Sequence, residues 1–232
     1  MSYSQDKWID YGNYYIYNDE QRTIGWKQAR KGRVTGSIVS ECIGNKNFHT
    51  PLEMANQIAG ISSIPISSEQ QKIMDYGTLH EDDARKWYSD MNGVTVREGG
   101  FAVPKFDSRI GMSPDGIVII NNEEVGLIEI KCPQSFYKPL IDYENKGRPS
   151  TEKYNHIWRS HYDQMQMGMA IFDKKWCDYI VFCIPDNKVF VERVYRNRDY
   201  WNEMYNKICK FIDTILKPIL ISIKSPYPYL PF

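Results

Sequence analysis

An aspartate, a glutamate and a lysine interrupt one of the most apolar stretches of the chain, GMSPDGIVIINNEEVGLIEIKCP at residues 111–133. Asp115 lies in a Pro-Asp-Gly turn before the run GIVII, and Glu129 and Lys131 stand two residues apart in the run VGLIEIK. Ionised groups in or beside an apolar strand cost several kcal/mol unless a partner compensates their lost hydration. The three side chains are therefore expected to compensate one another.

Their spacing favours a site for metal-dependent hydrolysis of phosphodiesters. Residues two apart in a strand face the same side, so Glu129 and Lys131 project together, and Asp115 can reach them across a hairpin. Two converging carboxylates repel each other, and a divalent cation relieves that repulsion. Oxygen ligands favour Mg²⁺ or Mn²⁺ over zinc. Such a cation activates a water and polarises a phosphate oxygen, while the lysine orients the water.

The alternative is a surface Glu-x-Lys pair beside an unrelated turn aspartate, which is what most isolated Glu-x-Lys pairs are. The Pro-Asp-Gly turn and the apolar strand both favour the hydrolytic site over that alternative.

Two helices are predicted before this hairpin. The first spans residues 50–60, with a capping box at its start and a glycine at its stop. The second runs from residue 67 or 68 to about 91, because its apolar residues recur at three-and-four spacing. Glu81 lies on the same stripe and should turn inward, the alternative being an edge glutamate paired with a basic neighbour. The stripe comprises Ile73, Gly77, Ala84, Trp87 and Met91.

Strands dominate residues 101–132, namely GFAV, GIVII and VGLIEIK, with an Asn121-Asn122 turn that predicts antiparallel pairing of the last two. A helix from about Tyr154 should turn Gln164 inward, followed by the strands CDYIVFC and KVFVERVY and a helix over about 199–216. This order is typical of an α/β fold with a central mixed sheet covered by helices. The inward stripe of the middle helix is Ile157, His161, Gln164, Gly168 and Ile171.

Composition places the chain among ordinary globular proteins. The 232 residues predict a single domain over 1–232, whose end, SPYPYLPF at 225–232, is expected to pack as a surface tail. No apolar run reaches the roughly 18 residues that span a bilayer, so a soluble protein without a membrane partner is expected. Five cysteines without a CxxC pair predict free thiols in a reducing intracellular compartment.

The 29 basic and 29 acidic side chains balance overall, but residues 22–33 contain five basic residues and no acid. This basic cluster is either a solvated face or a phosphate-binding surface. The connection over 136–156 is either a DNA-contacting loop or a subunit contact. The histidines show no zinc spacing and are expected to pack or to face DNA: His80, His156 and His161.

Pro114-Asp115 and Glu129-Ile130-Lys131 match the PD-(D/E)xK nuclease signature, and the chain resembles the lambda-exonuclease-like family of viral alkaline exonucleases. The resemblance implies an α/β fold with a PD-(D/E)xK, restriction-endonuclease-like core, in which helices flank a central mixed β-sheet. Five ordered blocks carry it: WKQARKGRVTGS, GTLHEDDAR, SPDG, IEIKCP and YDQMQMGM.

The resemblance also implies roles for individual residues. Asp115 and Glu129 would bind the catalytic metal with the backbone carbonyl of Ile130, and Lys131 would position the attacking water. Glu81 would complete the acidic site, directly or through water. Gln164 would help to order Lys131 or the scissile phosphate.

Arg30 and Ser37 match family positions that bind the 5′-terminal phosphate. A short helix predicted over residues 37–43 would place Ser37 at an N-terminus that attracts anions, and Arg30 would add a charge-assisted fork. Trp26 is interpreted as a core anchor in preference to a base-stacking platform.

The sequence thus predicts a Mg²⁺-dependent 5′→3′ exodeoxyribonuclease, with Mn²⁺ as a substitute, that resects one strand of duplex DNA for recombination or repair. One alternative is an endonuclease of the same fold acting on DNA or RNA, and another is an inactive DNA-end-binding scaffold. The expected partners are double-stranded DNA ends and, by resemblance, a single-strand annealing protein and two further copies in a trimeric ring. The resemblance also suggests a viral or phage origin.

Overall fold

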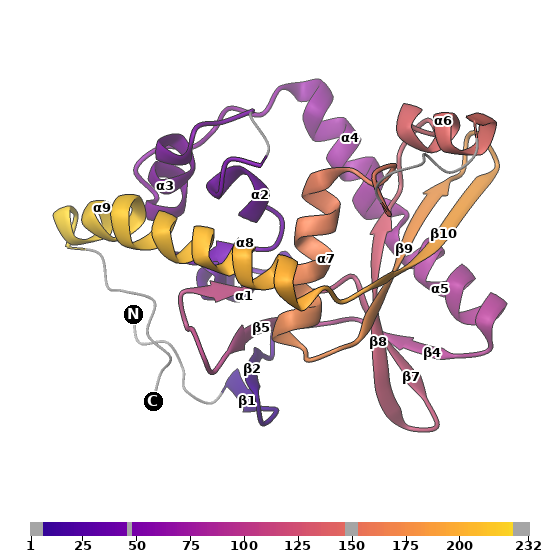
Figure 1. Ribbon diagram of the computed structural model, residues 1–232, viewed down its shortest axis with the longest axis horizontal. Helices are drawn as coiled ribbons and strands as arrows, with labels where there is room; N and C mark the ends of the chain where they lie inside the picture. The colour runs from indigo at the N-terminus through magenta and orange to yellow at the C-terminus, as the bar shows by residue number, and fades with distance from the viewer. Residues whose placement is uncertain (1–6, 46–47, 147–152, 225–232) are drawn as a thin grey trace.

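The structure, a computed structural model, describes residues 7–45, 48–146 and 153–224. Its largest sheet is a mixed five-stranded one with the order β10-β9-β8-β7-β4, on the right in Figure 1. β7 and β8 pair antiparallel, β8 and β9 run parallel, and the outer pairs are antiparallel. The predicted hairpin and both later strands are therefore confirmed. The strands are β4 (Thr95–Arg97), β7 (Gly116–Ile120), β8 (Glu123–Lys131), β9 (Trp176–Cys183) and β10 (Lys188–Tyr195).

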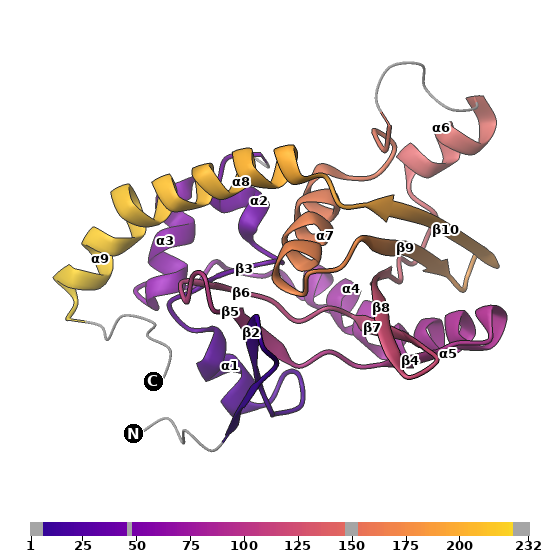
Figure 2. The ribbon, with the colours of Figure 1, turned by 60° about the horizontal axis from the view of Figure 1, so that its bottom comes forward.

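Helices cover both faces of this sheet, as Figure 2 shows. α7 (Arg159–Ile171) contacts β8 and β9, whereas α5 (Glu81–Asn92) contacts β8 and β4. Alternate residues of β8 enter separate cores, with Leu127 in the core that includes α7 and Ile128 in the core that includes α5. Because the side chains of a strand alternate, Glu129 lies on the same side as Leu127, toward α7.

Shorter elements form a second region beside the sheet (Figure 1). The strand predicted from GFAV is β5, which joins β1 and β2 in a separate antiparallel sheet, and β3 pairs with β6 in parallel. The helix predicted over 50–60 is confirmed as α3, including its capping box. The elements here are β1 (Trp8–Asp10), β2 (Tyr14–Tyr17), α1 (Ile24–Arg30), β3 (Val34–Thr35), α2 (Val39–Cys42), α3 (Pro51–Ala59), β5 (Phe101–Pro104) and β6 (Ile110–Gly111).

The final helix is longer than the sequence predicts. α8 (Arg198–Phe211) passes into a π-helical turn (Ile212–Leu216) and then into α9 (Lys217–Ser222), and the three form one rod in Figure 1. The predicted end at about residue 216 falls at the π-helical turn, through which the apolar stripe continues because Ile212, Leu216 and Leu220 are all buried.

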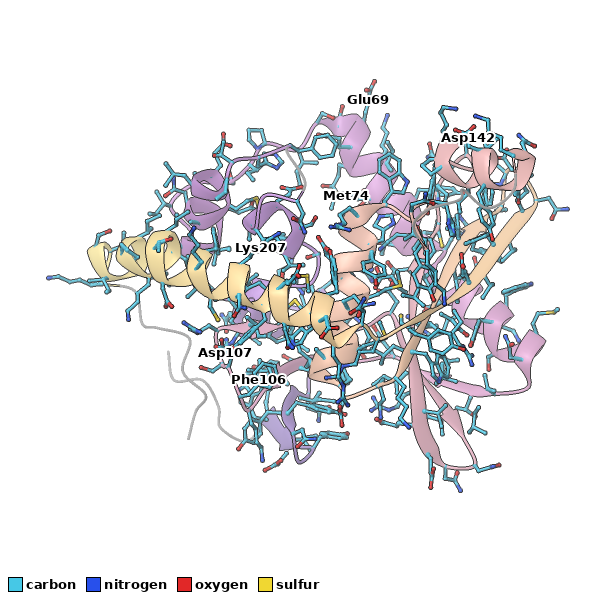
Figure 3. The ribbon with its side chains drawn as sticks, in the orientation of Figure 1. Glu69, Met74, Phe106, Asp107, Asp142 and Lys207 are labelled. Atoms are coloured by element: carbon cyan, nitrogen blue, oxygen red, sulfur yellow. The ribbon has the colours of Figure 1, made fainter. Side chains whose placement is uncertain are left out.

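Buried Asp107 fixes this rod to the loop after β5, and Figure 3 shows Asp107 beside Phe106 under α8. Asp107 accepts hydrogen bonds from the Tyr205 hydroxyl at 2.9 Å and from Arg109 at 2.8 Å. Arg109 also donates to Asp213 at 2.9 Å. The Asp107–Arg109 pair thus connects the C-terminal rod to the β1-β2-β5 sheet, against which α1 packs.

The single helix predicted from residue 67 or 68 to 91 is wrong in one respect. It is divided at His80 into α4 (Ser68–Leu79) and α5, since the His80 N–H bonds to the Gly77 carbonyl at 3.3 Å and tightens the turn. The predicted stripe is correspondingly interrupted. Ala84 is fully buried, whereas Ile73 of α4, which buries no residue, is 55% exposed and Met91 near the end of α5 is 67% exposed.

Three further predictions need correction. The helix predicted from Tyr154 begins at Arg159, because Tyr154 takes a left-handed φ of 68° in a turn. The connection over 136–156 contains a helix, α6 (Lys138–Lys146), and its residues 147–152 lie outside the described residues. The short helix predicted over 37–43 is reduced to α2. The tail at 225–232 also lies outside the described residues.

Two expectations from composition concern the cysteines, predicted to be free thiols, and membrane-spanning segments, of which none is predicted. All five cysteines are free, and four of them are buried. In the described ranges, no helix combines the length and apolar character needed to cross a membrane.

Gly126 in β8 leaves no space for a side chain. A Cβ there would lie 2.4 Å from three atoms of the Trp176 ring, and the guanidinium of Arg193 covers that ring at 3.7 Å. We expect Gly126→Ala to lower the free energy of unfolding by about 1–3 kcal/mol, measured by urea denaturation. Gly77→Ala is the matched control, because its Cβ would make only an ordinary 3.8 Å contact. Equal stabilities for the two variants would contradict the prediction.

Candidate active site

The hairpin register places Asp115 beside Glu129. Gly116 pairs with Ile128, so Asp115 stands one residue before that pair, opposite Glu129 on the neighbouring strand. Its Oδ2 accepts the backbone N–H of Ile130 at 2.7 Å, and its carbonyl accepts from Nε of Arg85 at 2.9 Å. The Pro-Asp-Gly turn is thus fastened both to β8 and to α5.

Glu129 and Lys131 form a tight ion pair with Nζ 2.5 Å from Oε1. The Glu129 side chain is 2% exposed and that of Lys131 27%, so the ammonium lies on the solvent side of the carboxylate. Burial and then the charge of Asp115 raise the pKa of Glu129 to about 8, against the opposing effect of Lys131. Burial alone would lower the pKa of Lys131, but the charges of Glu129 and Asp115 raise it overall.

Glu81 is the first residue of α5 and pairs with a basic residue far away in the sequence. Nη2 of Arg22 donates to its Oε2 at 2.7 Å, and the Glu81 side chain is 24% exposed. Burial and the charge of Asp115 raise the pKa of Glu81, whereas Arg22 lowers it. Glu81 therefore belongs to the electrostatic cluster of Asp115 and Lys131, although its stripe is partly exposed.

The donor set fits a hard divalent cation. In residues 7–45, 48–146 and 153–224, no three His, Cys, Asp or Glu side chains already converge as a metal-binding group. Each predicted carboxylate is instead turned toward a protein donor: Glu129 toward Lys131, Asp115 toward the Ile130 N–H, and Glu81 toward Arg22. Burial and then the charge of Asp115 raise the pKa of both Glu129 and Glu81, and a cation such as Mg²⁺ relieves this repulsion between carboxylates.

Arg30 and Ser37 also meet, as the sequence predicts. Nη2 of Arg30, at the end of α1, donates to Oγ1 of Thr35 and to Oγ of Ser37, each at 3.1 Å. The guanidinium lies 4.2 Å from the centre of the Trp26 ring. Burial lowers the pKa of Arg30 to about 10, so it remains a cation at neutral pH. Ser37 lies in a turn before α2, and it contributes its hydroxyl and not a helix N-terminus.

A hollow of about 450 Å³ opens beside Arg30. Its walls include Lys27, Lys31 and Thr35 with Gln57 and Ile58 of α3. Four cations of the basic cluster, Lys27, Arg30, Lys31 and Arg33, therefore line one concave surface, which is the arrangement that attracts a phosphate.

Arg22 lies away from the hollow, and Arg33 lines it but is bound mainly to backbone carbonyls. Arg22 reaches Glu81, and Arg33 is 4% exposed and donates to the carbonyls of Ala29 and Ser108. The cluster is thus neither a uniform solvated face nor a single phosphate-binding surface.

Two residues near these sites are not identified by the sequence reasoning. Ser113 accepts the indole N–H of Trp26 at 2.9 Å, which joins the Arg30 hollow to the turn that carries Asp115. Arg22 joins Glu81 from a distance of 59 residues. The only signal for Ser113 is its place in the SPDG block, and for Arg22 its place in the basic cluster.

Gln164 and Trp26 are both partly buried. Gln164 is half-buried on α7, and its Cγ lies 3.3 Å from where a Cβ on Gly36 would be, next to Ser37. Its role in ordering Lys131 or a phosphate stays a prediction. Trp26 is only partly buried against a small core that includes Phe101, and its ring also supports Arg30.

The histidines all have side-chain partners. His80 lies 2.9 Å from Asp83, and His161 lies 2.7 Å from the hydroxyl of Tyr179. His156 is buried and hydrogen-bonded to Glu192. These contacts agree with packing roles.

Comparisons with known proteins place this arrangement in a family. The YqaJ-like viral recombinase domain matches residues 25–175. The alkaline exonuclease LHK-Exo from Laribacter hongkongensis is 26% identical, with a TM-score of 0.68 over 87% of this chain and 96% of that chain. Its complex with dAMP is 25% identical, with a TM-score of 0.68 over 87% and 98%.

A phage-related exonuclease from Haemophilus somnus 129PT shares the fold, with 15% identity and a TM-score of 0.53 over 83% of this chain and 96% of that chain. Among curated proteins, no sequence matches significantly. The predicted PD-(D/E)xK core and the resemblance to lambda-exonuclease-like nucleases are confirmed. The chain belongs to the YqaJ-like viral recombinase family and has the fold of its alkaline exonuclease relatives.

Proposed function

We propose that this protein is a divalent-cation-dependent 5′→3′ exodeoxyribonuclease that resects one strand of duplex DNA from an end and leaves a 3′ single strand for recombination. The observation that carries the proposal is the combination of a carboxylate and lysine cluster with a separate, basic Arg30 hollow. The Trp26–Ser113 hydrogen bond joins the two sites. The alkaline exonuclease relatives support the reaction class.

The carboxylate cluster would carry out the hydrolysis, and the Arg30 hollow would bind the end of the DNA. Asp115 and Glu129, with the carbonyl of Ile130 and with Glu81, would hold Mg²⁺ or Mn²⁺, which polarises a phosphate oxygen and activates water when bound. Lys131 would orient the attacking water and stabilise the negative charge that develops on the phosphate. Gln164 would help to order that lysine or the phosphate.

The 5′ end of the DNA would be held in the hollow. Arg30 presents a planar fork of donors that suits a terminal phosphate, and Ser37 adds a hydroxyl donor. Anchoring the terminal phosphate there would place a bond near the 5′ end at the carboxylates, which gives the enzyme its end specificity and its direction.

The test is digestion of a linear duplex that carries a 5′-phosphate at one end and a 5′-hydroxyl at the other, beside a closed circle of equal sequence, with Mg²⁺ or Mn²⁺. We expect preferential loss of the 5′-phosphorylated strand and an intact circle. Cleavage of the circle would indicate an endonuclease, and no cleavage of any substrate would indicate an inactive DNA-end-binding protein.

Arg30→Gln should remove the preference for a 5′-phosphate. The substitution keeps a hydrogen-bonding but shorter side chain and loses the charge, so the ratio of rates on phosphorylated and hydroxyl ends should fall by about tenfold, as for one lost charge-assisted contact. The rate on the hydroxyl end should change much less. Lys72→Gln, on exposed α4, is the control. An unchanged ratio in Arg30→Gln would refute the 5′-phosphate pocket.

We also propose a single nuclease domain in a reducing intracellular compartment. α8 lies outside the matched family segment yet contacts α7 and α2, and all five cysteines are free thiols. A trimeric ring and a single-strand annealing partner rest on the family resemblance alone. Light scattering and pull-down from the native host would test them.

A further inference from the structure

The loop between β2 and α1 carries a second cation, besides Lys131, to the carboxylate cluster. Its residue Arg22 has a left-handed φ of 70°, a backbone conformation that residues other than glycine rarely adopt. Gln21 donates to the carbonyls of Gly99 at 3.0 Å and Pro114 at 3.4 Å, and Thr23 donates to the carbonyl of Glu20 at 2.8 Å. The loop is therefore fastened on both sides of Arg22, which aims its side chain at Glu81.

The Arg22–Glu81 pair differs from the Glu129–Lys131 pair in its exposure to solvent. The Arg22 side chain is 47% exposed, whereas that of Lys131 is 27% exposed on a central strand. An ion pair of this exposure is weak and easily exchanged. Arg22 can therefore leave Glu81 at little cost when a better anion arrives.

A phosphate of the DNA backbone is such an anion. A guanidinium binds a phosphate through two parallel donors and releases counterions from the nucleic acid. The pair also has a consequence for the cation, because a divalent ion that uses Glu81 must compete with Arg22 for the same carboxylate. When a phosphate binds Arg22, Glu81 becomes available to the cation, and when the cation binds Glu81, Arg22 becomes available to a phosphate.

We propose that Arg22 couples cation binding to DNA binding: it neutralises Glu81 in the free protein and exchanges Glu81 for a DNA phosphate, which leaves the carboxylate to the cation. The inference rests on the proposed function of the cluster. The two ligands are thermodynamically linked, so that DNA raises the affinity of the protein for the cation and the cation raises its affinity for DNA.

Arg22→Gly is the informative variant, because glycine adopts a φ of 70° without strain and so preserves the loop. Without DNA, we expect the variant to bind Mn²⁺ about fivefold more tightly than the wild type, measured by electron paramagnetic resonance of free Mn²⁺. In EDTA, where no cleavage occurs, we expect it to bind a 5′-phosphorylated duplex about fivefold more weakly by fluorescence anisotropy. Damage to the fold would instead weaken both.

Two comparisons make the test specific. Lys86→Gln removes one positive charge from an exposed pair farther along α5 and should change neither affinity by as much. Arg22→Lys keeps the charge without the fork and should fall between the wild type and Arg22→Gly.

The outcomes separate this inference from the proposed function. Equal Mn²⁺ affinities in the wild type and Arg22→Gly, or a loss of both affinities, would overturn the inference alone. Absence of any Mn²⁺ binding that Asp115→Asn weakens would overturn both the cation site and the coupling.

Discussion

Replacing Asp115 by asparagine is expected to abolish cleavage and to leave the fold intact. The amide oxygen of asparagine can still accept the Ile130 N–H that Asp115 accepts at 2.7 Å, so the turn before β7 should keep its place. The variant loses the negative charge that a cation requires beside Glu129. A loss of about a thousandfold or more in rate corresponds to roughly 4 kcal/mol of transition-state stabilisation, which is in the range of metal-ion catalysis.

The measurement is the single-turnover rate on a 5′-phosphorylated duplex with Mg²⁺ and with Mn²⁺. Asp90→Asn is the matched control, since Asp90 is exposed on α5 and pairs with Lys86 far from the cluster. Circular dichroism and binding of duplex DNA in EDTA should match the wild type. Cleavage at more than about a tenth of the wild-type rate would reject the mechanism, because one lost charge in a metal site should cost far more.

Lys131→Met should have the second-largest effect and should separate catalysis from stability. Methionine fills much of the volume of lysine, so the packing is retained and the ammonium is lost. We expect the cleavage rate to fall by about a hundredfold or more, because the attacking water and the developing charge lose their donor. The free energy of unfolding should also fall, by roughly 1–3 kcal/mol, because Glu129 is left buried without its 2.5 Å partner.

A double variant resolves the two effects. Adding Glu129→Gln to Lys131→Met replaces the buried ionisable group by a neutral amide, and most of the lost stability should return in urea denaturation. Activity should not return, because both catalytic groups are absent. Recovery of cleavage in the double variant, or wild-type cleavage by Lys131→Met alone, would remove Lys131 from the reaction. Lys86→Met serves as the exposed control.

Several errors in the sequence-based expectations arise where local preference yields to packing. The spacing that predicts one helix from 67 or 68 to 91 holds only in part for α5, where Ala84 is buried but Met91 is exposed, and the buried Tyr88 is not on the predicted stripe. The spacing does not hold for α4, which buries no residue. The apolar residues of α4 therefore do not show which face of the helix points toward the core. The helix predicted from Tyr154 starts at Arg159 because a left-handed turn residue precedes it.

The sequence by itself determined the hairpin and the shared face of Glu129 and Lys131. A strand alternates its side chains every two residues, so Glu129 and Lys131 share a face as a local property of β8. The Asn-Asn turn pairs Ile120 with Glu123, but a bulge beside Val118 and Ile119 then shifts the register by one residue, and this shift, which the sequence did not indicate, brings Asp115 opposite Glu129. The family blocks also predicted the contact of Arg30 with Ser37, seven residues apart.

Only the tertiary structure decided the pairing of Arg22 with Glu81 and of Trp26 with Ser113, across 59 and 87 residues. These contacts depend on how the loop before α1 packs against the turn at Pro114 and the start of α5. No periodicity records that packing, because it is set by the sum of many weak contacts between distant segments and not by the preferences of the residues that finally meet.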